Sequence, residues 1–107
     1  MKTPLPHLIV DVTLYPTDVG GRRSPTRAKW FICPCKLTKN ADIAWDCRLY
    51  YDAPIAPGET RRGVGAVFLS KDGLPLFRQA GRFYLWDGRI IGEATVVEPT
   101  PLEPGPA

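Results

Sequence analysis

The first regular pattern along the chain is an alternation of apolar and polar side chains over residues 8–15. Successive side chains of a β-strand point to opposite faces of the sheet, so this alternation predicts a half-buried strand. The apolar residues that share one face are Leu8, Val10, Val12 and Leu14. Pro16 ends the run, and the glycine, serine, proline and arginine residues of 17–26 predict a long loop.

Residues 28–37 and 43–51 form two further β-rich runs, joined by five residues. A connection of that length is usual for a β-hairpin, so we expect the two runs to pair antiparallel. A hairpin that is symmetric about Asn40 buries one apolar face and leaves charged residues on the other, which is what fixes the register of a sheet. The apolar pairs in that register are Leu37–Ile43, Cys35–Trp45, Cys33–Cys47 and Phe31–Leu49.

The rest of the pattern also predicts strands. Residues 63–69 form a fourth run, in which Gly63 and Gly65 indicate sharp bending or close backbone approach. Runs at 82–86 and 89–97 flank the dipeptide Asp87-Gly88, which predicts a hairpin with a type I′ turn and positive φ at both central residues. No segment has a sustained 3.6-residue apolar period with caps, so little helix is expected. Such a chain is all-β, and a sandwich or a closed barrel are the economical architectures.

Composition places this chain among single-domain proteins. Its length of 107 residues suits one hydrophobic core, and 44% apolar with 23% charged residues are ordinary values for a globular domain. No apolar run approaches the roughly 20 residues that cross a bilayer, and two prolines near the N-terminus do not suit a signal peptide. We expect a cytoplasmic protein with an N-terminal extension over 1–7, a folded part over 8–98 and a flexible Pro-rich tail over 99–107.

The cysteines are the main candidates for a metal site. Three thiolates with His7 would complete a zinc tetrahedron, but Cys-x-Cys on a strand differs from the Cys-x-x-Cys turns of structural zinc sites. We therefore expect Cys33, Cys35 and Cys47 to pack in the core as small hydrophobic side chains. A cross-strand disulfide between Cys33 and Cys47 is the alternative in an oxidising compartment. His7, the single histidine, is expected to be a solvated surface group rather than a base or a ligand.

No catalytic constellation is visible in the sequence. The carboxylates are spread over separate predicted strands, and no phosphate-binding loop of the G-x-x-x-x-G-K-[ST] type occurs. We therefore expect a protein that binds a partner, without enzymatic activity, a cofactor, a metal or a GTP site. Basic residues cluster in the predicted loop and the strand after it, where a footprint for phosphate and a solvated loop are both plausible interpretations. They are Arg22, Arg23, Arg27, Lys29, Lys36 and Lys39.

Three motifs, in this order, resemble the third, C-terminal domain of elongation factor Tu. Gly20-Gly21-Arg22-Arg23-Ser24-Pro25 is similar to the family's Gly-Gly-Arg-x-Thr-Pro loop, and Pro57-Gly58-Glu59 to its Pro-Gly-Asp. Gly81-Arg82-Phe83, Asp87-Gly88-Arg89 and Ile91-Gly92 are similar to its final hairpin. The resemblance covers about residues 8–98 and implies a closed six-stranded antiparallel β-barrel.

The resemblance also implies a role. In the family this domain is not catalytic: it packs against the GTPase domain, meets the exchange factor and touches the T stem of aminoacyl-tRNA. Family tRNA contacts correspond here to Ser24, Gly88 and Lys71. Charge adds further candidates for partner binding, which are Arg22, Arg23, Arg27 and Arg89.

The functional hypothesis is therefore a stand-alone, non-catalytic barrel that binds a protein or a tRNA, in connection with translation. These 107 residues hold neither the GTPase domain nor the middle barrel of the family, so GTP-dependent delivery of tRNA is not expected of this chain alone. The alternative is an adaptor or immunity-type protein whose protein partner is unrelated to translation.

Overall fold

The computed structural model of the chain describes residues 5–97. The predicted extension over 1–7 is therefore described only from Leu5, and the tail predicted for 99–107 lies outside the described residues. Within the described range, no helix is long and apolar enough to cross a membrane.

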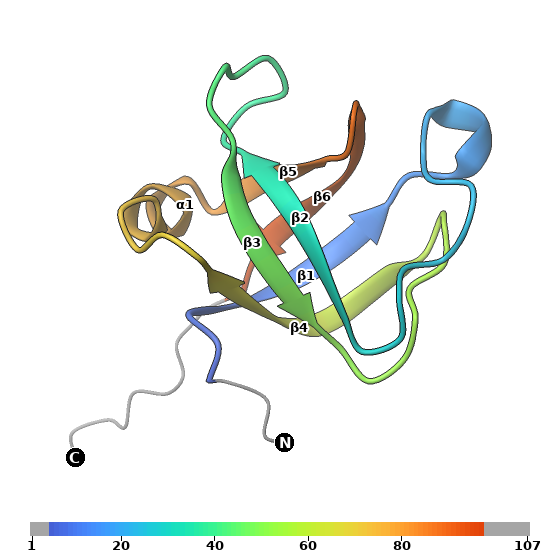
Figure 1. Cartoon of the computed structure of the whole chain (residues 1–107), viewed down its shortest axis with the longest axis horizontal. Coiled ribbons are helices and arrows are strands. Elements are labelled where there is room, and N and C mark those ends of the chain that lie inside the picture. The colour runs from blue at the N-terminus through green and yellow to red at the C-terminus, as the bar shows by residue number, and fades with distance from the viewer. Residues whose placement is uncertain (1–4, 98–107) are drawn as a thin grey trace.

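Six antiparallel strands close into a barrel in the order β1-β4-β3-β2-β5-β6 (Figure 1). Every neighbouring pair in that ring is antiparallel, so the predicted closed six-stranded antiparallel β-barrel is confirmed. The strands are β1 (Leu8–Leu14), β2 (Trp30–Lys36), β3 (Trp45–Tyr50), β4 (Thr60–Phe68), β5 (Arg82–Trp86) and β6 (Ile90–Val96).

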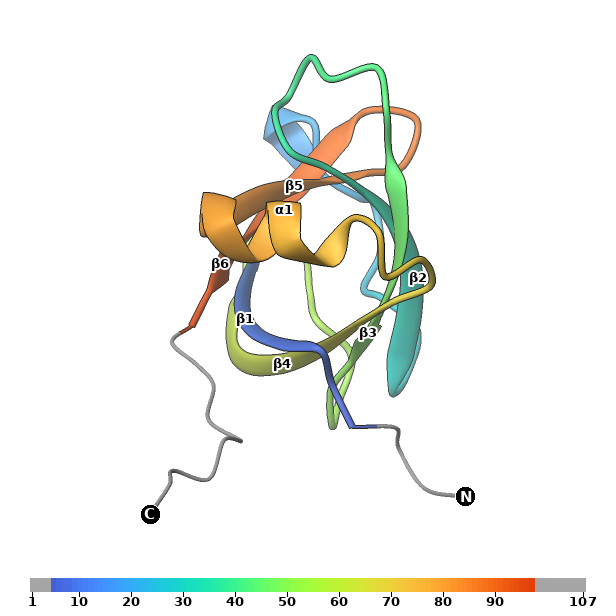
Figure 2. The ribbon, with the colours of Figure 1, turned by 90° about the vertical axis from the view of Figure 1, so that its left-hand side faces the viewer.

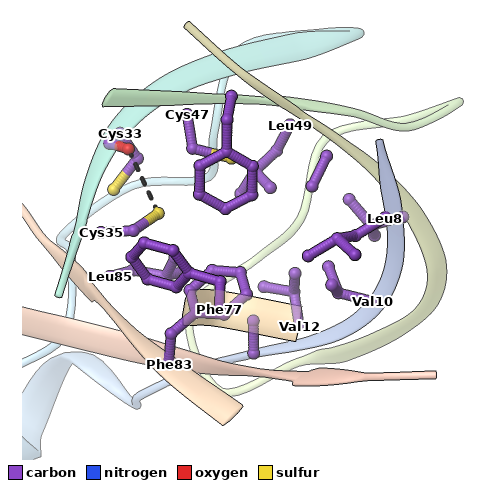
Figure 3. Packing of buried hydrophobic residues seen from close by; sticks show 14 of the residues in the cluster. Leu8, Val10, Val12, Cys33, Cys35, Cys47, Leu49, Phe77, Phe83 and Leu85 are labelled. Atoms are coloured by element: carbon purple, nitrogen blue, oxygen red, sulfur yellow. Dashed lines mark hydrogen bonds between the residues drawn. The ribbon is translucent and has the colours of Figure 1, made fainter. Parts of the chain in front are cut away.

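The core lies inside the barrel and follows from the alternation in each strand. The buried face predicted for β1 is confirmed: Leu8, Val10, Val12 and Leu14 are all buried. Inward side chains of the other strands join them in one cluster (Figure 3). Each fully buried aliphatic or aromatic side chain of this kind stabilises the fold by about 1.5–3 kcal/mol relative to exposure.

A short helix, α1 (Leu74–Ala80), was not expected from the sequence. Figure 2 looks along the barrel and shows α1 lying across its opening. Phe77 is the buried side chain of the helix, and its ring lies 4.8 Å from that of Phe68 and 5.0 Å from that of Phe83. The helix ends at Gly81, whose φ of 75° lets its N–H bond to the Phe77 carbonyl. Seven residues are too few to show a helical apolar period, which is why the pattern missed it.

The hairpin of β2 and β3 has the predicted register over most of its length. The pairs Phe31–Leu49, Cys33–Cys47 and Cys35–Trp45 are confirmed. The outermost prediction is wrong, because β3 begins at Trp45 and Ile43 is 65% exposed in the preceding loop. All three cysteines are buried free thiols, which confirms their predicted place in the core.

Both predicted glycine effects can be checked against the backbone. Gly63 has a φ of 72° and lies where the β1–β4 register shifts, so the predicted bend in this strand is confirmed. The type I′ turn is wrong: Gly88 has a φ of 79°, but φ of Asp87 is not positive. A register shift at Leu85 and Trp86 spreads the reversal over three residues, with Trp86 paired to Ile90.

Candidate functional site

Two segments that the sequence analysis singled out separately form one surface. They are the basic loop, residues 20–27 after β1, and the hairpin turn, residues 87–89 between β5 and β6. Arg89 joins them, since its Nε donates to the Gly20 carbonyl at 2.7 Å and its Nη2 to the Gly21 carbonyl at 3.1 Å. Arg22 adds an ion pair, with its Nη1 3.5 Å from Oδ2 of Asp87. The predicted site residues of the two segments therefore lie together.

The basic loop is held at its first end by glycine geometry. A 3-10 turn, η1 (Thr17–Val19), leads into Gly20, whose φ of 98° lets its N–H bond to the Thr17 carbonyl. The next residue, Gly21, is buried against the preceding chain, and a Cβ there would overlap the carbonyl of Tyr15. Only glycine fits this close approach, so the Gly-Gly pair fixes where the loop leaves the barrel.

The other end of the basic loop is held by Thr26, which is buried. Its N–H donates to the Ile55 carbonyl at 3.0 Å, and its Oγ1 accepts the N–H of Ile55, also at 3.0 Å. The loop is thus bonded to the β3–β4 connection as well as to the hairpin turn, and its exposed residues stand on a fixed backbone.

Arg22 is an internal support of this loop. Its Nε donates to the Ser24 carbonyl at 3.1 Å and its Nη2 to the Pro25 carbonyl at 3.4 Å. The guanidinium also lies over the Phe31 ring, 4.8 Å from its centre, and the side chain is only 20% exposed. Arg22 and Arg89 are therefore positioning residues, because Nε and Nη2 of each side chain donate to main-chain carbonyls within the chain.

Arg23, Ser24 and Arg27 are the exposed polar side chains of the basic loop. Over residues 5–97 neither arginine has a carboxylate within ion-pair distance. The nearby acid Asp87 is paired with Arg22, so it does not neutralise them. Gly88 is exposed at the tip of the hairpin turn, beside this group. The surface therefore presents two uncompensated positive charges and a hydroxyl.

Lys71 lies away from this surface. It belongs to the connection between β4 and α1, at the end of the barrel where β1 begins, whereas the basic loop follows the other end of β1. Its charge is felt there by His7, which precedes β1. The structure therefore does not bring Lys71 together with the other predicted contacts.

His7 is not the freely solvated group that the sequence analysis expected. The side chain is half-buried, and its Nδ1 accepts the backbone N–H of Phe68 at 3.0 Å. Burial lowers the pKa of His7, and the positive charges of Lys71 and Arg78 lower it further. The imidazole thus serves as a neutral acceptor that ties the chain before β1 to the end of β4.

The cysteines are poor candidates for chemistry. Burial raises the pKa of Cys33 to about 12 and raises the pKa of Cys35 well above its ordinary value. A thiol acts as a nucleophile or a metal ligand as its thiolate, which this core disfavours. In the part of the chain that the structure describes, no group of three or more His, Cys, Asp or Glu side chains is placed to hold a metal ion.

The apolar outer face of β2 was not predicted. Charged residues were expected on that side of the hairpin, but Trp30 and Ile32 also lie there and are 40% and 42% exposed. The signal was present in the sequence: residues 30–35 of this strand are apolar at every position, so both of its faces are apolar.

No family model matches this chain, and no curated protein matches its sequence. The similarity to the elongation factor domain therefore depends on the three sequence motifs, and the barrel is what the structure adds to them.

Proposed function

We propose that this protein is a non-catalytic binding module whose basic loop and hairpin turn contact the phosphates of an RNA, with tRNA as the first candidate and translation as its setting. The observation that carries the proposal is the joining of the two segments by Arg89 and Arg22. Ser24 and Gly88, two of the three contacts that the resemblance implies, belong to these joined segments, as a single partner would need.

The chemistry of this surface suits a phosphate backbone. Arginine binds phosphate through several donors at once, and a serine hydroxyl adds one more hydrogen bond. Arg23, Ser24 and Arg27 supply these groups from a backbone that is bonded at both ends, which lowers the entropy lost on binding. The interior of the barrel is filled by the hydrophobic core, so in this proposal the barrel is a scaffold that holds the basic loop and the hairpin turn.

Salt-dependent binding tests this proposal. We expect tRNA affinity to fall as salt rises, with a log–log slope of about −1.5 to −3.5 if two to four phosphates are neutralised. Arg23→Glu and Arg27→Glu should each weaken binding about tenfold or more. Lys71→Glu makes the same charge change at the other end of the barrel and is the matched control, with a much smaller effect expected.

The result that contradicts the proposal is equally clear. If no tRNA binds at low salt, or if the Lys71 variant loses as much affinity as the Arg23 variant, the basic loop is not the contact surface. A protein partner unrelated to translation is then the alternative, and the exposed apolar side chains of β2 are the observation that favours it.

A further inference from the structure

An uncovered apolar strip runs along the outer side of β2. We call it the β2 face and define it as Trp30, Ile32 and Pro34, together with their neighbours Arg48 and Tyr50 on β3. Figure 2 shows β2 and β3 along one side of the barrel, with no other element lying outside them. Exposed apolar side chains in a row on a strand are unusual on a monomer unless they meet a partner.

The main chain of β2 is also unpaired along part of one edge. The Tyr51 N–H bonds to the Lys29 carbonyl, so by alternation the odd-numbered residues of β2 direct their peptide groups to β3 and the even-numbered ones away from it. On that other side β2 pairs with β5 only at Cys35 and Lys36. Within residues 5–97 no backbone hydrogen bond serves Trp30 or Ile32 on this side. Pro34 has no N–H to leave unpaired.

Cations border the apolar strip. The guanidinium of Arg48 lies over the Trp30 ring at 5.4 Å from its centre, and that of Arg27 lies at 5.8 Å. The Nη1 of Arg48 donates to the Tyr50 hydroxyl, but its buried Nε has no partner in the described part of the chain. Asp46 lies at the far end of the strip, opposite Pro34. At the Trp30 end, the strip is therefore an apolar surface bordered by the positive charges of Arg27 and Arg48.

We propose that the β2 face binds an extended acidic segment of a partner protein. Apolar side chains of the segment pack on Trp30 and Ile32, its carboxylates meet Arg27 and Arg48, and its main chain bonds to the free edge of β2. Addition of a strand to an exposed edge is a recurrent mode of peptide recognition. The β2 face shares Arg27 with the basic loop, but this proposal does not depend on RNA binding there.

Other occupants fit the β2 face less well. A second copy of this chain would bring the same basic border against itself, and like charges across an interface oppose association. Successive RNA bases need several aromatic rings on which to stack, whereas Ile32 and Pro34 continue the strip beyond Trp30 without an aromatic ring.

The test uses the full chain and displayed nine-residue peptides. One library carries Asp or Glu at alternate positions and random apolar residues between them, and a second replaces the acids with lysine. We expect enrichment from the acidic library alone, and NMR titration of a selected peptide should shift the Trp30 indole and Ile32 methyl signals. Ile32→Glu and Arg48→Gln should each weaken that peptide at least tenfold, while the conservative Ile32→Val should keep most of the affinity.

Specificity controls complete the design. Ile32 is exposed, so its replacement should leave the temperature of thermal unfolding unchanged. Arg23→Glu should change peptide affinity by no more than about twofold, although it weakens tRNA binding. The proposal is overturned by equal enrichment of the two libraries or by shifts that map outside the β2 face. It is also overturned if a single-stranded oligouridylate binds the face in the peptide's place, which would make it a nucleic-acid platform.

Discussion

The two ends of the barrel are closed by different chemistry. At the helix end, Phe77 of α1 packs between Phe68 and Phe83, and the contact is apolar. At the loop end, arginine side chains donate to main-chain carbonyls: Arg89 to Gly20 and Gly21, as described above, and Arg61 to Ala53 and Pro54 at 2.8 and 2.9 Å.

This difference separates stability from recognition. Apolar closure contributes free energy in proportion to the buried area, and salt does not screen it as it screens interactions between charges. Polar closure contributes less per contact, but it fixes the direction of exposed groups and keeps positive charge at the surface. The helix end should therefore dominate folding energetics, and the loop end should dominate binding.

The largest effect is expected from Phe77→Ala. Removal of this fully buried ring should lower the free energy of unfolding by about 3–5 kcal/mol, measured by urea denaturation. Leu76→Ala, at an exposed position of the same helix, is the matched control and should change stability by no more than about 0.5 kcal/mol. Equal losses in the two variants would mean that α1 does not close the core as described.

A smaller effect is expected at the glycine pair. Gly21→Ala places a Cβ into the Tyr15 carbonyl, so the loop must shift, and we expect a cost of about 1–3 kcal/mol. Gly20→Ala meets no atom within 4 Å but keeps a positive φ, so about 1–2 kcal/mol is expected from backbone strain alone. The Gly21 variant should also bind tRNA more weakly. An unchanged affinity would mean that the shape of the loop does not matter for binding.

Arg89→Lys sharpens the same comparison with a still smaller change in stability, about 1 kcal/mol. The charge is kept, but the two directed bonds to Gly20 and Gly21 are lost, because an ammonium cannot reproduce the planar fork of a guanidinium. We expect faster amide exchange in the basic loop and weaker tRNA binding at unchanged net charge. Arg62→Lys is the control on a strongly exposed arginine. Unchanged amide exchange in the Arg89 variant would mean that the bonds from Arg89 to Gly20 and Gly21 do not hold the basic loop in place.

The smallest effect concerns pH and the helix end. The pKa of His7 is lowered in the folded chain, so the unfolded chain binds protons more readily than the folded one. The stability from neutral His7 is therefore complete above the ordinary histidine pKa of about 6.5 and is lost as pH falls through the lower folded value. Urea midpoints at pH 7.5 and 5 should show this drop, and His7→Gln should reduce it. A drop of the same size in that variant would assign it to other groups.

The fold could be predicted where pattern alone decides it. The alternation of β1 and the facing apolar residues of β2 and β3 specify which side is buried, and a slip by one residue would expose the core face. The pattern could not reveal α1, whose one buried anchor is Phe77, nor the loop that carries Ile43 out of β3. The helix depends on an opening that exists only after the barrel has closed, and the alternation of apolar residues does not show where β3 begins.

The candidate site was predictable in composition but not in roles. The sequence showed arginines in the basic loop and in the hairpin turn, yet Arg22 meets Asp87 across 65 positions of chain. That contact turns an expected ligand contact into an internal support. The apolar face of β2 was readable from the sequence, since Trp30 and Ile32 occupy positions that a solvated face would give to polar residues.

The pairing of β1 with β6 has a consequence for how the protein forms. β1 lies between β4 and β6 in the ring, and its contact between Val10 and Val96 joins strands from opposite ends of the folded sequence. Such long-range closure slows folding, because the entropy of a long loop is lost before the contact is gained. A nascent chain that lacks residues 90–96 leaves one edge of β1 without a partner, so this barrel should become native all at once, only after those residues have been made.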